Sequence, residues 1–186
     1  MESMLRQSIE EMTELLPRLA SLSGQMEKLA AAVMKCWAGR GKVLVAGNGG
    51  SAADAMHFAE ELVVRFGKNR RALAAIALTD PTVVTCAAND FGFESVFTRQ
   101  VEALGNPGDI LVVLTTSGNS PNIVRALKFA KEQKLVTAAF LGKDGGKCRG
   151  LADIELLIPS EITARIQEAH KLLYHTLCHW LDSQVD

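Results

Sequence analysis

Two titratable side chains, His57 and Glu61, lie four residues apart in a stretch whose sequence predicts a helix. Residues at positions i and i+4 are neighbours on one face of a helix. A carboxylate beside an imidazole can act in general acid–base catalysis or bind a metal ion, and a solvated pair without a function is the plain alternative. The pair follows a glycine-rich loop by one or two helical turns, which favours the functional interpretations.

That loop, Gly47 to Ser51, is one of two that could bind an anion. Its glycines permit positive φ and close approach of a ligand, and the N–H groups that open the next helix favour a negative charge. The second loop, Thr115 to Pro121, offers four hydroxyls around one glycine, and its proline suits the first turn of a helix. Neither loop contains Lys or Arg. Together they predict a site for a phosphate monoester, although Ser and Asn in either loop could simply cap a helix.

A dinucleotide site is disfavoured. The spacing Gly47-x-Gly49-x-x-Ala52 fits the G-x-G-x-x-G/A pattern formally. That pattern needs an acidic residue about 20 positions further on, at the end of the second strand. The first acidic residue beyond that strand is Asp80, which is too far along the chain, and the expected region is basic.

The C-terminal segment predicts one long helix that carries Gln167 and three histidines, His170, His175 and His179. The histidine spacings of five and four do not place all three on one face of a helix. We expect at least two of them to be packing or surface residues. Spacing alone does not select the functional one.

Alternating strands and helices must position these side chains. The strands are near-continuous apolar runs, which is typical of a parallel sheet buried on both faces. The chain therefore predicts an α/β fold, a three-layer doubly wound parallel sheet of the flavodoxin-like or Rossmann-like kind, in a single domain over 1–186. The predicted strands are 42–46, 73–78, 109–114, 135–141 and 153–158. The predicted helices are 51–66, 81–88, 93–104, 121–133 and about 162–184, with segment 89–92 as a connection.

Residues 1–39 predict a helical extension in two segments, each with one apolar stripe. We expect Pro17 to bend or interrupt the first segment. The stripes could cover the core of this domain or pack against another subunit, and both possibilities stand at this stage.

Composition gives no sign of a nucleic-acid or membrane partner. The 186 residues carry a formal net charge of −1, and no uncharged apolar run reaches the 18 residues or more that a membrane span needs. The four cysteines are scattered without a C-x-x-C pair, as free thiols of a reducing compartment are, and the acidic N-terminus lacks the apolar core of a signal peptide. We therefore expect a cytoplasmic protein.

Five segments of the chain resemble a known family. They are G-N-G-G-S-A-A-D-A-M-H-F-A-E-E-L at 47–62, A-N-D-F-G-F at 88–93, T-T-S-G-N-S at 115–120, G-K-D-G-G-K at 142–147 and R-I-Q-E-A-H at 165–170. In this order they resemble the phosphoheptose isomerases, the sedoheptulose 7-phosphate isomerases of the sugar isomerase (SIS) domain superfamily. The resemblance runs over essentially the whole chain, whereas T-T-S-G-N-S by itself would indicate only an SIS domain.

The resemblance implies a flavodoxin-like SIS fold in a homotetramer with active sites at subunit interfaces. It implies aldose–ketose isomerisation of sedoheptulose 7-phosphate to D-glycero-D-manno-heptose 7-phosphate, the start of the bacterial route to ADP- or GDP-heptose for lipopolysaccharide and other surface polysaccharides. By matching positions, it implies that Glu61 and His175 are the acid–base pair. One Zn²⁺ per subunit is implied, with the ligands His57, Glu61, Gln167 and His175. The implied substrate contacts are Asn48, Gly49, Gly50, Ser51, Glu61, Arg65, Asn89, Asp90, Thr115, Thr116, Ser117, Ser120 and Gln167.

The implied chemistry suits these residue types. Isomerisation needs a base to take a proton from the carbon next to a carbonyl, and an acid to move protons between the two oxygens of an enediol. A metal ligand is a weaker base, so the two roles implied for Glu61 are in tension. We expect the acid–base role, with zinc bound in the same place.

The two ligands implied on the last helix are far apart for one ion. Gln167 and His175 are separated by roughly 12 Å along a regular helix and about 80° around it. Either the helix begins after Gln167 or the pair is divided between subunits.

Two other functions fit an SIS domain. One is a non-catalytic protein that binds the bacterial replication initiator, a group that lacks the carboxylate and histidine found here at Glu61 and His175. The other is a sugar-phosphate-sensing module, usually fused to a further domain. The presence of both residues in this single domain favours the enzyme.

Overall fold

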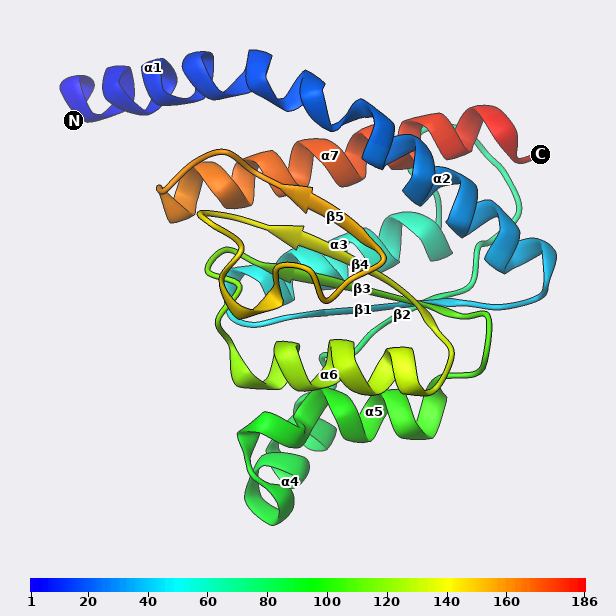
Figure 1. The fold of residues 1–186 in the computed structure, drawn as a ribbon. Helices are drawn as coiled ribbons and strands as arrows, with labels where there is room; N and C mark the ends of the chain where they lie inside the picture. The colour runs from blue at the N-terminus through cyan, green and yellow to red at the C-terminus, as the bar shows by residue number, and fades with distance from the viewer.

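The computed structural model describes residues 1–186 and contains a central sheet with helices on both sides (Figure 1). Its strands are β1 (Val43–Gly47), β2 (Ala75–Ala77), β3 (Ile110–Thr115), β4 (Val136–Leu141) and β5 (Ile154–Leu157). Its helices are α1 (Glu2–Leu19), α2 (Ser23–Ala38), α3 (Gly50–Val63), α4 (Pro81–Phe91), α5 (Val96–Leu104), α6 (Pro121–Glu132) and α7 (Thr163–Gln184). Short 3₁₀ turns span Ala20–Leu22, Phe93–Ser95 and Gly146–Cys148.

Every strand pair is parallel, and the strand order is β2-β1-β3-β4-β5. This confirms the predicted doubly wound sheet, with the flavodoxin-like strand order. From β1 the chain crosses to β2 on one side, and β3 then lies on the other side of β1. The winding therefore reverses between β1 and β3. Gly47 pairs with Leu114 across these two strands, so the loops that follow them leave the sheet side by side at this switch point.

Successive strand residues point into two separate apolar clusters. On one face, Val43 and Val45 pack with residues of α1, α2, α3 and α7. On the other face, Leu44 and Ala46 pack with residues of α4, α5 and α6. Figure 1 shows the same two layers on opposite sides of the sheet. Burial of both faces explains why the strands are continuous apolar runs without alternation.

Helix α3 ends at Val63, three residues before its predicted end. The guanidinium of Arg70 donates to the carbonyl oxygens of Glu61 (2.7 Å) and Leu62 (3.0 Å). These carbonyl groups are among those left without partners at the end of a helix, so the arginine caps α3. The last turn of the helix that carries Glu61 is fixed in this way.

Arg70 is held in turn by Asp182 of α7. Its Nε donates to one carboxylate oxygen (2.8 Å), and the other oxygen accepts the N–H groups of Gly67 (2.7 Å) and Lys68 (3.1 Å). Burial raises the pKa of Asp182, but the hydrogen bonds from Gly67, Arg70 and Lys68 outweigh burial and leave the pKa below its ordinary value. The loop after α3 is therefore tied to the end of α7 by a buried ion pair.

Helix α4 continues to Phe91, through most of the segment predicted as a connection. It ends at Gly92, whose φ of 83° is in the region that favours glycine. Asp80 caps its start by accepting the N–H groups of Thr82 and Val83. The helix is thus bounded by an ordinary cap at each end.

The N-terminal extension is helical, as predicted. Pro17 lies inside α1, which continues to Leu19 before a 3₁₀ turn leads into α2, so the proline does not interrupt the helix. The stripe of α2 is covered by its own domain, since Leu29, Val33 and Cys36 are buried. For α2 the first of the two possibilities is therefore correct.

Helix α1 leaves much of its apolar stripe uncovered. Leu15 and Leu19 are buried, but Leu5 and Ile9 are 61% and 56% exposed. In Figure 1 the N-terminal part of α1 extends past the body of the domain. A single copy of the chain gives this surface no partner.

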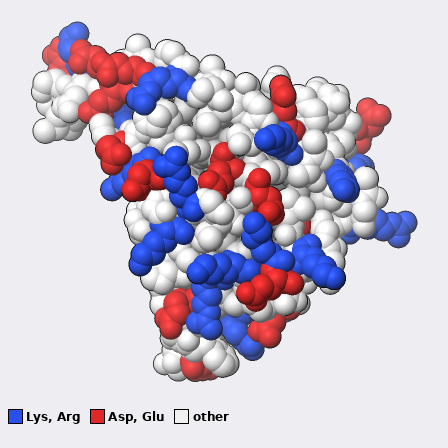
Figure 2. Space-filling view, viewed as in Figure 1, with Lys and Arg blue, Asp and Glu red and all other residues white.

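Basic and acidic side chains are mixed on the face seen in Figure 2. The mixture agrees with a formal net charge of −1. None of the helices combines the length and apolar character required to cross a membrane.

His170 is fully buried between α7 and the sheet. Its Nε2 lies 3.3 Å from the carbonyl oxygen of Leu141, to which it can donate, and its ring packs edge-on against Phe140. Burial lowers the pKa of His170 to about 4, against smaller opposite effects of the Leu141 carbonyl and Asp54. The imidazole is therefore neutral in the folded protein at pH 7, and its role is packing.

We expect His170 to make the fold sensitive to mild acid. The unfolded chain binds a proton at this histidine near pH 6.5, whereas the folded chain does so only near pH 4. The free energy of unfolding should fall by about 2 kcal/mol between pH 7 and pH 5 for this reason. Urea denaturation at one protein concentration measures the change.

His170→Gln should lose this part of the pH dependence. The matched control is His179→Gln, because His179 is an exposed histidine of the same helix. If His170→Gln and the unaltered protein lose the same free energy between pH 7 and pH 5, buried His170 is not the cause.

Candidate active site

The loops after β1 and β3 form one small pocket at the carboxyl edge of the sheet. Its volume is about 110 Å³. All but one of its lining residues belong to the predicted substrate contacts, and Leu114 is the exception. The lining residues are Asn48, Ser51, Leu114, Thr115, Thr116, Ser117, Ser120 and Gln167.

The first loop presents backbone N–H groups. Gly49 has φ 56° and ψ −122°, a conformation open in practice only to glycine, and α3 begins at the next residue. The N–H groups of Gly49 and Gly50 donate to no acceptor within the chain. A Cβ atom on Gly50 would meet the end of the Gln167 side chain, so this amide of α7 lies directly against the loop. Free N–H groups at a helix start suit an anion.

The second loop is held by its own hydroxyl groups. Thr115 Oγ1 accepts the N–H of Gly118 (3.2 Å), and Ser117 Oγ accepts the N–H of Asn119 (3.2 Å). Gly118 has φ 64°, and a Cβ atom there would collide with the backbone of Gly145. The loop is therefore fixed in shape before any ligand binds. Hydroxyls and amides without a cationic side chain suit a phosphate monoester.

A pair of amides ties the two loops together. Asn48 of the first loop and Asn122 at the start of α6 exchange two side-chain hydrogen bonds, each of 2.9 Å. Asn122 Oδ1 also accepts the N–H of Ile123 (2.9 Å), and the Asn122 side chain is buried. The position of Asn48 in the pocket thus depends on Asn122, a residue that does not line it.

We expect Asn122→Ala to weaken the binding of inorganic phosphate about tenfold, because Asn48 loses both hydrogen bonds that orient it. Isothermal titration calorimetry measures the affinity. Asn106→Ala is the control, since Asn106 is exposed in a loop at the opposite edge of the sheet. Equal phosphate affinities for the two variants would show that the amide pair does not shape the pocket.

His57 and Glu61 of α3 meet His175 of α7. One ligand atom from each lies within 4.8 Å of the others. His57 Nε2 is 3.1 Å from Glu61 Oε1, and the His57 and His175 rings meet edge-on with centroids 5.1 Å apart. Of the three histidines of the last helix, His175 is therefore the one that lies beside His57 and Glu61.

The surroundings favour a neutral imidazole at His175. Burial, with a smaller effect of His57, lowers the pKa of His175, although Glu61 opposes the change. Next to it, burial and the Asp54 carboxylate raise the pKa of the Tyr174 hydroxyl. A neutral His175 at pH 7 has a free lone pair to accept a proton or bind a cation.

This cluster fits a divalent metal ion. His175 Nε2 is buried without a hydrogen-bond partner, and buried polar atoms rarely lack one. Two imidazoles and a carboxylate are the donors of many catalytic zinc sites, which keep a further position for water or substrate. The residues His57, Glu61 and His175 can therefore hold such an ion within one chain.

Gln167 lies elsewhere on α7. The helix begins at Thr163, so the suggestion that it begins after Gln167 is wrong. The Gln167 side chain lines the loop pocket and contacts Gly50, whereas His175 lies in the cluster two turns further along the helix. Within one chain the structure brings Gln167 to the loop pocket and not to the histidine cluster.

Three predicted substrate contacts, Arg65, Asn89 and Asp90, belong neither to the two loops and the pocket lining nor to the histidine cluster of their own chain. Arg65 follows the end of α3, is exposed, and donates to Asn69. Asn89 and Asp90 are exposed near the end of α4, where the Asn89 amide donates to the Asp90 carboxylate (2.7 Å). Their contact with substrate stays a prediction.

The sequence reading missed three residues of the site: Asp54, Tyr174 and Asn122. Asp54 was detectable as a lone acidic residue in an apolar stretch, three positions before His57. Tyr174 is the only tyrosine of the chain and precedes His175. Nothing in the sequence pairs Asn122 with Asn48, 74 residues earlier.

Comparison with known proteins identifies relatives along the whole chain. The family model described as SIS domain matches residues 7–142. A phosphoheptose isomerase of Paramagnetospirillum magneticum is 52% identical over 165 residues, 88% of this chain and 86% of the relative. A phosphoheptose isomerase of Geobacter sp. (strain M21) is 45% identical over 185 residues, 99% of this chain and 95% of the relative.

Solved structures agree with this comparison. The phosphoheptose isomerase of Neisseria gonorrhoeae superimposes with a TM-score of 0.92 and 41% identity, covering 98% of each chain. The phosphoheptose isomerase of Francisella tularensis superimposes with a TM-score of 0.94 and 39% identity, covering 97% of each chain. The similarity includes both the N-terminal extension and the last helix.

Proposed function

The chain belongs to the SIS-domain family and, within it, to the phosphoheptose isomerases, and from this premise we propose that His57, Glu61 and His175 are the reacting centre of its isomerase activity. We propose sedoheptulose 7-phosphate as the substrate and D-glycero-D-manno-heptose 7-phosphate as the product, at the start of ADP- or GDP-heptose synthesis. The observation that carries the proposal is the convergence of these three side chains beside a phosphate-sized polar pocket.

The spacing of the two sites suits a long sugar phosphate. Ser51 of the pocket and His57 of the cluster are six residues apart on α3, about 9 Å along the helix. A phosphate at one end of a seven-carbon chain can occupy the loop pocket while the carbonyl end reaches the cluster. Gln167, in the pocket, would then contact the sugar near its phosphate.

Acid–base chemistry follows from the arrangement. Glu61 takes a proton from C1 of the ketose, which leaves an enediolate with its negative charge on the C2 oxygen. His175 then takes the proton of the C1 hydroxyl and delivers it to the C2 oxygen, and Glu61 returns its proton to C2, which gives the aldose. The Glu61 oxygen Oε1 faces His57, while Oε2 has no partner within the chain and is free for the proton at carbon.

We also propose one Zn²⁺ per subunit, held by His57, Glu61 and His175. When bound, the ion would polarise the carbonyl oxygen and stabilise the negative charge of the enediolate. Glu61 would then hold the ion as well as act as the base, and its two carboxylate oxygens would allow both roles.

Glu61→Gln should abolish incorporation of solvent deuterium into sedoheptulose 7-phosphate in D₂O, because an amide cannot take the proton from carbon. We expect turnover to fall by about 10²- to 10⁴-fold, with inorganic phosphate bound as before. NMR of the sugar measures the exchange.

Glu60→Gln is the matched control, since Glu60 is the neighbouring carboxylate and is exposed. Retained exchange in Glu61→Gln would remove Glu61 from the role of base. Absence of exchange in the unaltered, zinc-loaded protein would contradict the isomerase reaction itself.

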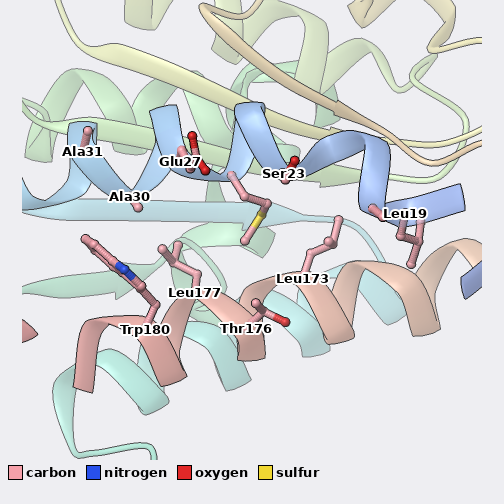
Figure 3. A pocket seen from close by; sticks show the side chains of 11 residues that line it. Leu19, Ser23, Glu27, Ala30, Ala31, Leu173, Thr176, Leu177 and Trp180 are labelled. Carbon is pink, nitrogen blue, oxygen red and sulfur yellow. The ribbon is translucent and has the colours of Figure 1, made fainter. Parts of the chain in front are cut away.

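A homotetramer is the proposed assembly, supported by two uncovered apolar surfaces. The first is the exposed stripe of α1 with Leu5 and Ile9. The second is a groove of about 430 Å³ between α2 and α7 (Figure 3), where Leu19, Leu173 and Trp180 are among the lining residues. Surfaces of this kind on a soluble chain mark contacts with another copy or partner.

In a tetramer the metal site would be divided between subunits, with Gln167 of one copy completing the histidine cluster of another. Chains with Gln167→Ala and chains with His175→Ala should each be inactive, and mixed tetramers should regain part of the activity. Some mixed sites would combine intact Gln167 from one chain with intact His175 from the other. Light scattering confirms that mixing leaves the assembly size unchanged.

No recovery in mixed tetramers, once subunit exchange is established with differently tagged chains, would mean that each chain uses its own Gln167. We also propose substrate contacts for Asn89, Asp90 and Arg65. Their own chain does not bring these residues to its pocket, but a neighbouring copy in the tetramer would bring them there.

The cytoplasm is the proposed location, and the state of the cysteines supports it. All four are free thiols, and three of them are buried. Free thiols are usual in reducing compartments. Neither the replication-initiator partner nor the sugar-phosphate-sensing module is favoured by the relatives, which are named as isomerases.

A further inference from the structure

The His57 ring has a polar neighbour at each nitrogen. Nε2 faces Glu61 Oε1 at 3.1 Å, and Nδ1 lies 3.3 Å from the hydroxyl of Tyr174. The same hydroxyl lies 3.3 Å from Asp54 Oδ1. Tyr174 is fully buried and Asp54 is 6% exposed. A continuous chain of polar atoms thus runs from Asp54 through the tyrosine to His57.

The number of hydrogens available limits this chain to two directions. A tyrosine hydroxyl has one hydrogen to donate, and an ionised carboxylate has none. If the hydroxyl donated to His57, Asp54 Oδ1 would keep only the ammonium of Lys171, which is 3.3 Å away and partly exposed. If it donates to Asp54 and accepts the Nδ1–H of His57, the buried carboxylate gains a charge-assisted bond, and only Nε2 of His57 is left without a partner.

The second arrangement leaves the lone pair of His57 Nε2 directed at a carboxylate oxygen of Glu61. Two acceptors 3.1 Å apart repel one another unless a proton or a cation lies between them or beside both. His175 Nε2 is also buried without a partner. His57, Glu61 and His175 therefore present lone pairs toward one another, and this arrangement suits a cation.

We propose that Asp54, acting through the Tyr174 hydroxyl, fixes His57 in the tautomer with its proton on Nδ1 and so keeps Nε2 ready for a divalent cation. Both are positioning residues, because the chain of contacts reaches the ion only through His57. The inference rests on the metal centre of the proposed function and adds what orients one of its ligands.

The chain of contacts from Asp54 through Tyr174 to His57, here called the relay, depends on packing between two helices. Asp54 and His57 lie three residues apart on α3, whereas the phenol comes from α7. The Tyr174 ring stacks on Phe58 with centroids 5.2 Å apart, which places the hydroxyl between the carboxylate and the imidazole. Metal-ligating histidines commonly donate their second N–H to a group that sets tautomer and orientation, and loss of that group weakens metal binding.

Tyr174→Phe tests the relay, since it removes the hydroxyl and keeps the stacked ring. In metal-free, ¹⁵N-histidine-labelled protein at pH 8, two-bond ¹H–¹⁵N spectra should show His57 protonated on Nδ1, with the signal assigned from its loss in His57→Gln. In Tyr174→Phe the proton should move to Nε2, where it can donate to Glu61. Asp54→Asn should shift the same equilibrium in the same direction.

Zinc affinity gives a second readout. Competition with a chromophoric chelator should show Zn²⁺ binding weakened about 10- to 100-fold in Tyr174→Phe. Ser183→Ala is the control, because it removes an exposed hydroxyl from the same helix that bonds only within its own turn and to Gln184. Thermal unfolding of each variant checks that the fold is retained.

The outcomes separate this inference from the proposed function. If the unaltered protein binds zinc and Tyr174→Phe keeps both its His57 tautomer and its zinc affinity, the relay is wrong while the metal centre stands. If the tautomer changes as expected but the unaltered protein binds no zinc, the relay is supported and the metal centre is wrong.

Discussion

The packing of α3 against α7 is the contact on which the rest of the structure depends. Phe58 and Tyr174 stack at its centre, and the buried pair of Arg70 and Asp182 closes its end. Because Arg70 also caps the last turn of α3, the ion pair fixes the helix that carries Glu61. The same contact covers one face of the sheet with apolar side chains. Stability and chemistry therefore share one interface, where loss of a buried charged partner is costly.

The sheet contributes the other half of the arrangement. β1 and β3 are neighbours because the winding reverses between them, and their loops consequently share a pocket. α3 starts from the first of these loops and α7 runs beside it, so both helices lead from the pocket to the histidine cluster. In the proposed function, backbone and hydroxyl groups hold one end of the substrate, and titratable side chains carry out the proton transfers at the other end. The separation lets the loops stay rigid while the reacting groups face a different environment.

Polar groups inside this domain are mostly paired, and the exceptions are informative. Asp182 accepts three hydrogen bonds, and Asn48 and Asn122 satisfy one another. An unpaired buried polar atom at His175 coincides with the proposed reacting centre, as expected where a ligand supplies the missing partner. His170 carries an unpaired Nδ1 and is fully enclosed next to the sheet, so the same observation there indicates packing. Position relative to the pocket distinguishes the two histidines.

The sequence by itself determined the parallel sheet, its helices, the two loops that line the pocket and the pairing of His57 with Glu61. Each of these depends on residues close together in the chain: apolar runs set the strands, glycines set the turns, and four-residue spacing sets one helix face. Only the tertiary structure decided which histidine joins that pair, that Asn122 orients Asn48, and that Tyr174 reaches Asp54. These contacts join residues 74 to 120 positions apart. They depend on the rotation and register of one element against another, which side-chain packing in three dimensions fixes and local periodicity does not.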